Sequence, residues 1–359
     1  MMTYEKKYFQ ILLLFCSLNL LFCTKLSIRL QGEIHHPKTS DNWDLTLEHL
    51  SPRNTNDSKK YPVIICHGLV GNRNYFKIKE EKSIVARLIS EGYDVWLLDL
   101  RGRTDAGSPS LFFGEKTYSY SFDDYATKDV ETAITYVLEK TGSKKVNWIG
   151  HSMGGMVVYT KIGTYKEDRI ANLVTIGSPF SFYTPTKYLK SLSKFSSLLR
   201  IIPVVPLSSL AHLESDYNIP QPKNPFTRLF YYKENTEPEM ENKLKSLSTN
   251  NESPNVFKQF ANGVKTGEIQ SFNQTISYTS NLKNITTPVL LIAGRRDHLG
   301  TPTIVRQVYD NIGSSDKTIL VAGRSEGFAE DYGHVDLVMG TNSDSDINIP
   351  ITNWLNKRN

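Results

Sequence analysis

The stretch Gly150-His151-Ser152-Met153-Gly154 fits the pattern Gly-x-Ser-x-Gly and stands where an apolar strand gives way to a helix. The strand is expected over residues 145–149, and a helical spacing of apolar side chains begins at Met153. A serine at such a junction can be held on a tight, strained turn with its hydroxyl exposed above a sheet. Glycines on either side prevent collisions where helix and strand pack closely. This context makes Ser152 a candidate nucleophile.

Strands and helices alternate on both sides of this stretch. Short apolar strands are expected at 61–66, 93–98, 171–176, 289–293 and 318–321, and amphipathic helices at 78–91, 123–140, 303–311 and 347–357. An alternating stretch from Trp43 to Leu50 indicates an early antiparallel strand. The chain is therefore predicted to have an α/β fold, with a mostly parallel sheet covered by helices on both faces.

Residues 179–282 interrupt this alternation. They contain many prolines and aromatic residues and only short helical pieces. A run of roughly 100 residues without a sheet strand is too long for a plain loop. We therefore expect an inserted helical cap over 179–282, and a core domain made of 24–178 and 283–359.

The N-terminus has the composition of an export signal, expected over residues 1–23. Lys6 and Lys7 precede an apolar run over 11–22, which is shorter than the roughly 20 residues of a membrane-spanning helix. An uncleaved anchor or a buried helix is the alternative. The residues up to Cys23 resemble a bacterial lipoprotein processing box, although Phe22 stands where a small residue is usual. We expect an exported protein, secreted or membrane-anchored, with Cys23 a candidate for lipidation.

Charge and cysteine content bear on the expected partners and on disulfide bonds. The net charge of +5 is small for 359 residues, and there is no basic block with interleaved aromatic residues. Nucleic acid is therefore not an expected partner. Beyond the export signal Cys66 is the only cysteine, so no intrachain disulfide is possible in the mature chain.

A serine nucleophile needs a base, and the base needs an orienting acid. At an elbow of this kind the partners follow in the order serine, carboxylate, histidine. Asp297 follows the strand expected at 289–293, and His334 follows the last strand. We therefore predict a catalytic triad of Ser152, Asp297 and His334.

Neighbouring residues offer rival assignments. His298 could be taken for the base, and Asp331 or Asp336 for the acid. A turn-capping aspartate and a buried structural histidine are the alternatives for Asp297 and His334 themselves. Because His298 directly follows the proposed acid, it is a candidate substrate-binding residue. Phe180, one of the cap aromatics, is another, with a place in the cap core as its alternative.

The negative oxygen that forms during acyl transfer needs two backbone N–H donors. One should come from Met153, the residue after the nucleophile. The other should come from Leu69, because Gly68 lets the backbone bend after the strand that ends at Cys66. Each donor typically contributes about 2.7–4 kcal/mol to the transition state. The alternative is that this segment is only a turn.

These features together resemble the α/β-hydrolase superfamily over residues 43–355. Besides the elbow, the resemblance is carried by Pro62-Val63-Ile64-Ile65-Cys66-His67-Gly68 and by Gly92-Tyr93-Asp94-Val95-Trp96-Leu97-Leu98-Asp99-Leu100-Arg101-Gly102. The chain is most similar to esterase, lipase and lysophospholipase-like members with an inserted cap. This implies an eight-stranded sheet and a serine acyl-enzyme mechanism. Members that are epoxide hydrolases or haloalkane dehalogenases use aspartate, and polyhydroxyalkanoate synthases use cysteine, so Ser152 argues against all three.

The sequence thus predicts a serine hydrolase that cleaves carboxylic esters with an apolar acyl chain and requires neither a metal nor a cofactor. The expected partner is a small-molecule or lipid ester, with membrane association through the N-terminus. Three alternatives remain. They are an acyltransferase, an amidase or peptidase with the same triad, and a non-catalytic, surface-exposed binding protein on a hydrolase scaffold.

Overall fold

The computed structural model describes residues 29–52, 60–107, 109–111, 114–194, 202–208, 211 and 230–359. The expected export signal and Cys23 lie outside the described residues. None of the described helices combines the length and the apolar character needed to cross a bilayer.

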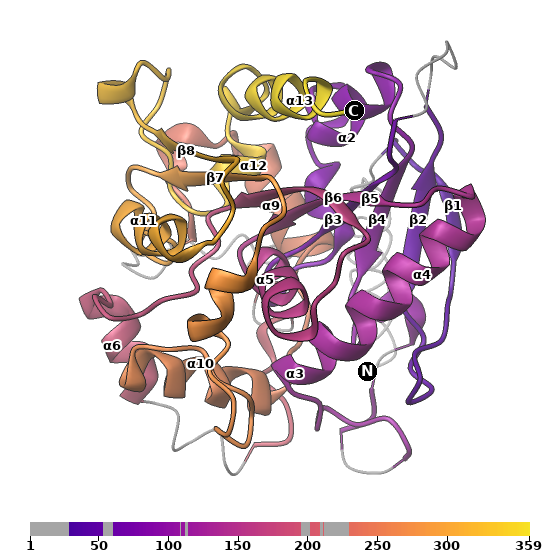
Figure 1. Ribbon diagram of the computed structural model, residues 1–359, viewed down its shortest axis with the longest axis vertical. Helices are drawn as coiled ribbons and strands as arrows, with labels where there is room; N and C mark the ends of the chain where they lie inside the picture. Colours follow the sequence, from indigo (N-terminus) through magenta and orange to yellow (C-terminus); the bar gives the residue numbers. More distant parts are fainter. Residues whose placement is uncertain are drawn as a thin grey trace, which may run out of the picture.

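An eight-stranded sheet forms the centre of the molecule (Figure 1). Its strands are β1 (Glu33–His35), β2 (Thr46–Leu50), β3 (Val63–Cys66), β4 (Val95–Asp99), β5 (Val146–His151), β6 (Ile170–Ile176), β7 (Val289–Gly294) and β8 (Lys317–Ala322). Their order across the sheet is β1-β2-β4-β3-β5-β6-β7-β8. β2 is antiparallel to both of its neighbours, and the pairs from β4 to β8 are parallel. The predicted α/β class and mostly parallel, eight-stranded sheet are therefore confirmed.

Helices cover both faces of this sheet (Figure 1). One face carries α4 (Val130–Thr141), α5 (Met153–Tyr165) and α11 (Pro302–Asn311), and the other carries α2 (Ile84–Ser90), α12 (Asp336–Met339) and α13 (Ile349–Asn356). Two separate apolar clusters result, one on each side. The buried strands β3 and β4 contribute alternate side chains to the two clusters, which explains why they are apolar without interruption.

Two expected helices differ in detail from those observed. The helix expected over 78–91 is a short 3-10 turn (Glu80–Lys82) followed by α2. The Ser83 hydroxyl accepts a hydrogen bond from the Ala86 N–H, so Ser83 is the N-cap residue at which α2 begins. The helix expected over 123–140 consists of α3 (Phe122–Asp124), a π-helical turn (Tyr125–Asp129) and α4.

The chain between β6 and β7 contains the short helical elements α6 (Lys187–Lys194), η6 (Lys233–Asn235), α9 (Pro238–Leu247), α10 (Pro254–Thr266) and η7 (Thr279–Asn284). Its described residues add no strand to the main sheet. Buried polar contacts join this segment to the rest of the fold: Glu252 binds Arg103, with 3.0 Å between Oε2 and Nη2, and Tyr125, with 2.7 Å between Oε1 and Oη. The predicted boundaries of the cap at 179 and 282 stay a prediction.

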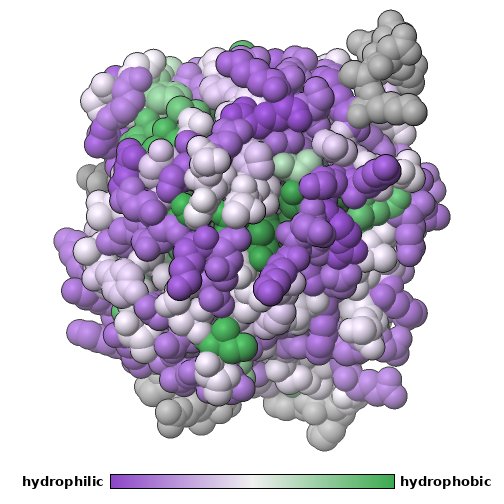
Figure 2. Space-filling model, in the orientation of Figure 1, coloured by the Kyte–Doolittle hydropathy of each residue, from purple (hydrophilic) through white to green (hydrophobic). Residues whose placement is uncertain are grey.

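The face of the molecule shown in Figure 2 is predominantly polar. Figure 2 shows apolar side chains there in small, separate patches among polar ones. Several large apolar residues of the segment between β6 and β7 are exposed, including Tyr183, Phe230 and Phe272. Scattered exposure of this kind is ordinary for a folded protein.

Candidate active site

Ser152 lies between β5 and α5 with no intervening loop. Its backbone has φ 53° and ψ −119°, a region that residues other than glycine rarely adopt. The Ser152 N–H donates to the Ile176 carbonyl at 2.8 Å, so the strained turn is tied to the end of β6. The side chain is half-buried rather than enclosed. This is the strained strand-to-helix turn that the sequence pattern predicts.

The two glycines of the pattern are required by close backbone packing. A Cβ at Gly150 would lie 2.4 Å from the carbonyl group of Gly154, and a Cβ at Gly154 would lie 2.2 Å from the Cys66 carbonyl oxygen. Both distances are far below van der Waals contact. The second one also shows that the first turn of α5 packs directly against the end of β3.

Asp297 and His334 are in direct contact, as the triad requires. Asp297 follows β7, His334 precedes α12, and both are almost fully buried. The His334 Nδ1 and the Asp297 Oδ2 are 2.7 Å apart. The other carboxylate oxygen of Asp297 accepts from the N–H groups of Leu299 at 2.7 Å and Gly300 at 2.8 Å. The acid is therefore fixed on both oxygens and can orient the imidazole.

Gly177, which follows β6, connects this pair to the serine. A Cβ at Gly177 would lie 3.0 Å from Asp297 Oδ2 and 3.2 Å from His334 Nδ1. The preceding residue, Ile176, accepts the Ser152 N–H. Both the turn that holds Ser152 and the imidazole therefore border residues 176–177. Among the described residues, no hydrogen bond joins the Ser152 hydroxyl to His334. His334 forms its hydrogen bonds through Nδ1, to Asp297, and through its backbone carbonyl, to His151. Catalytic hydrogen bonds often tighten only when a substrate binds.

The rival acids bind elsewhere. Asp336 Oδ2 accepts from the Gly333 N–H at 2.9 Å and from the Asn235 amide at 2.8 Å. Asp331 Oδ1 accepts from the Arg324 N–H at 2.9 Å. Among the described residues neither carboxylate is hydrogen-bonded to the His334 ring, so the geometry favours Asp297 as its partner.

The proposed oxyanion donors flank Ser152. A Cβ at Gly68 would lie 3.0 Å from the Ser152 Cβ, so the loop after β3 runs directly beside the elbow. Met153 is the first residue of α5, where N–H groups have no partner within the helix. Neither the Met153 nor the Leu69 N–H donates a backbone hydrogen bond within the described part of the chain. Both donors are therefore available at this end of the sheet.

A chain of hydrogen bonds joins the oxyanion loop to the histidine loop. The Gly68 N–H donates to the Tyr75 hydroxyl at 2.9 Å, and that hydroxyl donates to His151 Nδ1 at 2.9 Å. The His151 Nε2–H then donates to the His334 carbonyl at 3.1 Å. Burial lowers the pKa of His151 well below its usual value, so its ring is neutral and offers one donor and one acceptor. Sequence patterns gave no indication of this role for Tyr75 and His151, because it depends on contacts between distant segments.

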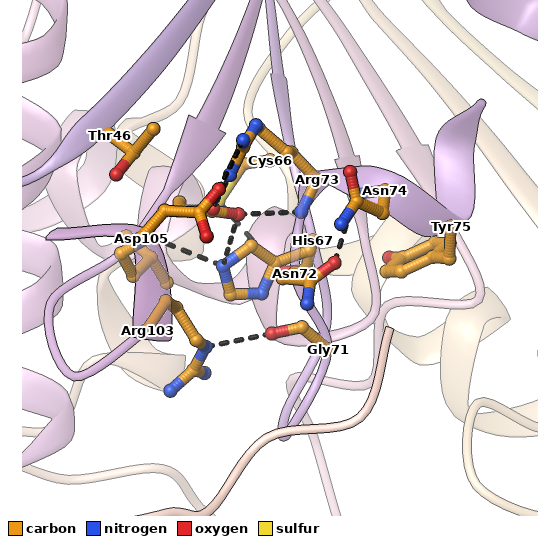
Figure 3. A network of polar contacts seen from close by, with 12 residues as sticks. Thr46, Cys66, His67, Gly71, Asn72, Arg73, Asn74, Tyr75, Arg103 and Asp105 are labelled. Atoms are coloured by element: carbon orange, nitrogen blue, oxygen red, sulfur yellow. Dashed lines mark hydrogen bonds and ion pairs between the residues drawn. The ribbon is translucent and has the colours of Figure 1, made fainter. Parts of the chain in front are cut away.

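A second buried network holds the loop after β3 from the other side (Figure 3). His67 donates from Nδ1 to the Gly68 carbonyl at 2.8 Å and accepts the Leu100 N–H on Nε2 at 3.2 Å, so its ring is neutral and fully paired. Burial lowers its pKa well below the ordinary value. The Arg73 guanidinium pairs with Asp99 and, at 2.7 Å, with Glu48.

This network extends toward the segment between β6 and β7. Arg103 donates to the Gly71 carbonyl at 2.7 Å (Figure 3). The other end of its guanidinium pairs with Glu252. Burial nevertheless raises the pKa of the Asp99 carboxyl, so Arg73 offsets only part of the cost of removing that charge from water. The network supports the loop, and among its buried side-chain atoms Arg103 Nη1 has no hydrogen-bond partner in the described part of the chain.

The two predicted substrate-binding residues have different surroundings. His298 is half-buried, with its Nε2 3.1 Å from the Tyr232 hydroxyl and its ring centroid 5.1 Å from that of Tyr188. Phe180 has no exposed surface and packs against Tyr159 with ring centroids 5.4 Å apart. His298 thus borders the segment between β6 and β7, whereas Phe180 belongs to the packed core. Substrate binding by either residue stays a prediction.

Comparison with known proteins identifies the family. A profile of the α/β-hydrolase fold matches residues 61–336, well over half of the chain. The chain belongs to the α/β-hydrolase family.

Lipases and esterases are among the relatives of this α/β hydrolase. It is 29% identical to the bovine (Bos taurus) gastric triacylglycerol lipase over 168 residues, 45% of this chain and 42% of the lipase. It is 24% identical to Lipase 3 of Drosophila melanogaster over 344 residues, 86% of each chain. It therefore spans less than half of the bovine enzyme. The fold superposes on an esterase from Exiguobacterium antarcticum with a TM-score of 0.59 and 18% identity, covering 90% of this chain and 99% of the esterase.

Proposed function

We propose that this protein is a serine hydrolase that cleaves carboxylic esters with an apolar acyl chain. The observation that carries the proposal is the Asp297–His334 pair, 2.7 Å apart and bordering Gly177 beside the strained Ser152 turn. A half-buried serine, a histidine held by a buried carboxylate and two N–H groups without a backbone partner, near the carboxyl ends of the parallel strands, support the proposal. These groups together supply what acyl transfer requires.

In the first half of the reaction Ser152 attacks the ester carbonyl carbon. The His334 Nε2 takes the hydroxyl proton, and the Asp297 carboxylate stabilises the resulting imidazolium through Nδ1. The Leu69 and Met153 N–H groups donate to the oxygen that becomes negative. When the intermediate collapses, the bond to the alcohol breaks and His334 gives its proton to the departing alkoxide. The acyl group then remains on Ser152.

The second half repeats these steps with water. His334 takes a proton from a water molecule, whose oxygen attacks the acyl carbon. The bond to the Ser152 oxygen then breaks, and the proton returns from His334 to the serine. The product is the free acid, and the protein returns to its starting state.

The choice of an ester with an apolar acyl chain rests on the relatives and on the surroundings of the site. The names of the matched relatives include a triacylglycerol lipase. The aromatic rings of Tyr188 and Tyr232 lie beside His298, next to the catalytic acid. Aromatic side chains provide the large apolar contact area that an acyl chain needs.

We also propose that the protein is exported and associates with membranes through its N-terminus. Lys6 and Lys7 followed by the apolar run over 11–22 support this proposal. Cys23 is the residue that would carry a lipid.

Hydrolysis of p-nitrophenyl esters by the purified protein, over a series of acyl-chain lengths with and without detergent micelles, tests the proposal. Ser152→Ala should lower kcat by about 10⁴- to 10⁶-fold, because the nucleophile is lost. Ser178→Ala is a matched control, since Ser178 is a buried serine near the elbow with only weak contacts to the Ile176 and Gly150 carbonyls. Full activity of Ser152→Ala would mean a different nucleophile.

An added acceptor alcohol distinguishes hydrolysis from acyl transfer, and matched amide substrates test for peptidase activity.

A further inference from the structure

The edge of the sheet at β1 brings together three groups that can bind metal ions. Glu33 pairs directly with His49 across the β1–β2 ladder, and His35, two residues along β1, projects from the same face. One ligand atom from each side chain lies within 4.8 Å of the other two. The His35 Nε2 and the Glu33 Oε1 are 3.7 Å apart, too far for a hydrogen bond.

His35 has a buried nitrogen without a partner. Its Nδ1 lies 3.0 Å from the Tyr136 hydroxyl on α4, which fixes the ring. Its Nε2 is buried and has no hydrogen-bond partner among the described residues. Leaving a buried polar atom unpaired costs about 1–3 kcal/mol, so such an atom usually has a ligand, an ion or water beside it.

His49 is held in a similar way. Its ring stacks on Trp96 with centroids 4.1 Å apart and planes 13° from parallel. Its Nε2 is hydrogen-bonded to the Asp94 carboxylate. Its Nδ1 makes no hydrogen bond to any described residue and is the nitrogen left to bind a ligand. A carboxylate that holds one nitrogen of a histidine while the other binds a metal is a recurrent arrangement in metal sites.

We propose that Glu33, His35 and His49 form a binding site for a divalent transition metal, of which Zn²⁺ fits best. Two imidazoles and a carboxylate suit zinc, whereas calcium and magnesium take mainly oxygen ligands. Zinc–ligand distances of about 2.0–2.1 Å in a tetrahedron place the ligand atoms about 3.4 Å apart. The 3.7 Å between His35 Nε2 and Glu33 Oε1 is close to this value, and Glu33 is exposed and free to adjust. Water completes the tetrahedron.

The site would act on stability rather than on catalysis. β1 is only three residues long and forms the outer edge of the sheet, separated from β5 by β2, β4 and β3 (Figure 1). A metal bridging β1 and β2 would fasten this short strand, and the binding free energy adds to folding. The site therefore leaves the proposed metal-free reaction unchanged.

Isothermal titration of Zn²⁺ into the chelator-treated full chain tests this site, with zinc alone as the probe. Wild type should bind one equivalent at this site. His35→Ala, His49→Ala and Glu33→Gln should each weaken that binding at least about tenfold, and Asp94→Asn by about 10- to 100-fold. His36→Ala is the matched control. His36 is the exposed neighbour of His35, with its Nδ1 3.1 Å from the Leu45 carbonyl, and its loss should leave the affinity unchanged.

Two further measurements distinguish loss of the zinc ligands from loss of the folded structure in the variants. At one zinc concentration, zinc should raise the melting temperature of wild type and of His36→Ala more than that of Glu33→Gln, whose exposed side chain is not needed for folding. X-ray absorption of the zinc-loaded protein should show imidazole ligands. The proposal is overturned if wild type binds no zinc, or if a His35→Ala/His49→Ala double variant that is folded by circular dichroism binds it as wild type does.

Discussion

Two buried polar clusters flank Ser152, and they differ in what they leave open. The β7–β8 cluster contains Asp297, His334 and Asp336, and within it His334 Nε2 has no hydrogen-bond partner among the described residues. The β3–β4 cluster contains Glu48, His67, Arg73 and Asp99, and both nitrogens of its histidine are paired. Both clusters contain a buried histidine near a buried aspartate, yet only one has a nitrogen left for chemistry. Between these two histidines, an unpaired ring nitrogen rather than the residue type therefore distinguishes the candidate catalytic group from the supporting one.

The largest expected effect concerns the acid of the β7–β8 cluster. Asp297→Asn should lower kcat about 10⁴-fold, because an amide cannot stabilise the imidazolium and favours the wrong tautomer. Asp331→Asn is the matched control, since Asp331 accepts from the Arg324 N–H and does not contact His334. Steady-state kinetics on one p-nitrophenyl ester measures both variants. Equal activities would remove Asp297 from the mechanism.

For the β3–β4 cluster the expected effect is on stability. Arg73→Met should lower the free energy of unfolding by about 3–5 kcal/mol, because it leaves the Asp99 carboxylate buried without its cationic partner. Glu48 loses one of its two cations and keeps Lys77. Arg87→Met, which breaks the half-exposed pair with Asp344, should lower the free energy of unfolding by no more than about 1 kcal/mol. Urea unfolding measures both free energies. If Arg73→Met unfolded as late as Arg87→Met, the cluster would not be a structural support.

Asp336 should make stability depend on pH. Burial raises the pKa of its carboxyl to about 6, above the ordinary value near 4. A carboxyl whose pKa is raised by folding stabilises the fold below its unfolded pKa, and this contribution is lost as the pH rises through its folded pKa.

The stability of wild type relative to Asp336→Asn should therefore fall by up to about 3 kcal/mol between pH 4 and pH 7. Urea unfolding over this range, with Asp331→Asn as the half-exposed control, measures the difference. A difference that does not vary with pH would mean that Asp336 is ionised in the fold at all these values.

The smallest effect concerns the link between the two clusters. Tyr75→Phe removes the acceptor of the Gly68 N–H and the donor to His151 Nδ1. We expect kcat to fall about tenfold, equivalent to about 1.4 kcal/mol, with little change in KM. The stability should fall by no more than about 1–2 kcal/mol. An unchanged kcat in a folded variant would show that the two loops are positioned independently.

The parts of the fold and of the candidate site that a local sequence pattern determines could be predicted from the sequence. The parts that depend on contacts between segments far apart in the chain could not. Ser152, Asp297 and His334 each follow a recognisable strand, and parallel strands bring their carboxyl ends to one edge, so the local pattern predicts their meeting. The strand β1 has the sequence Glu-Ile-His and is largely exposed, so no apolar run marks it.

The contacts of Tyr75 and of Arg73 depend on tertiary packing. Tyr75 binds His151, which is distant in the chain, and Arg73 binds Glu48 on an antiparallel strand. No local spacing links these pairs. The metal-binding juxtaposition at β1 escaped prediction for the same reason, because it requires the register of β1 on β2.

The proposed reaction depends on Ser152 being a nucleophile activated by His334. Reaction of the purified full chain with a fluorophosphonate, followed by peptide mass spectrometry, tests this most directly. We expect one adduct per chain, on Ser152, and labelling slowed by orders of magnitude in a folded His334→Ala variant. A wild-type chain that stayed unlabelled, or an adduct on another residue, would contradict it.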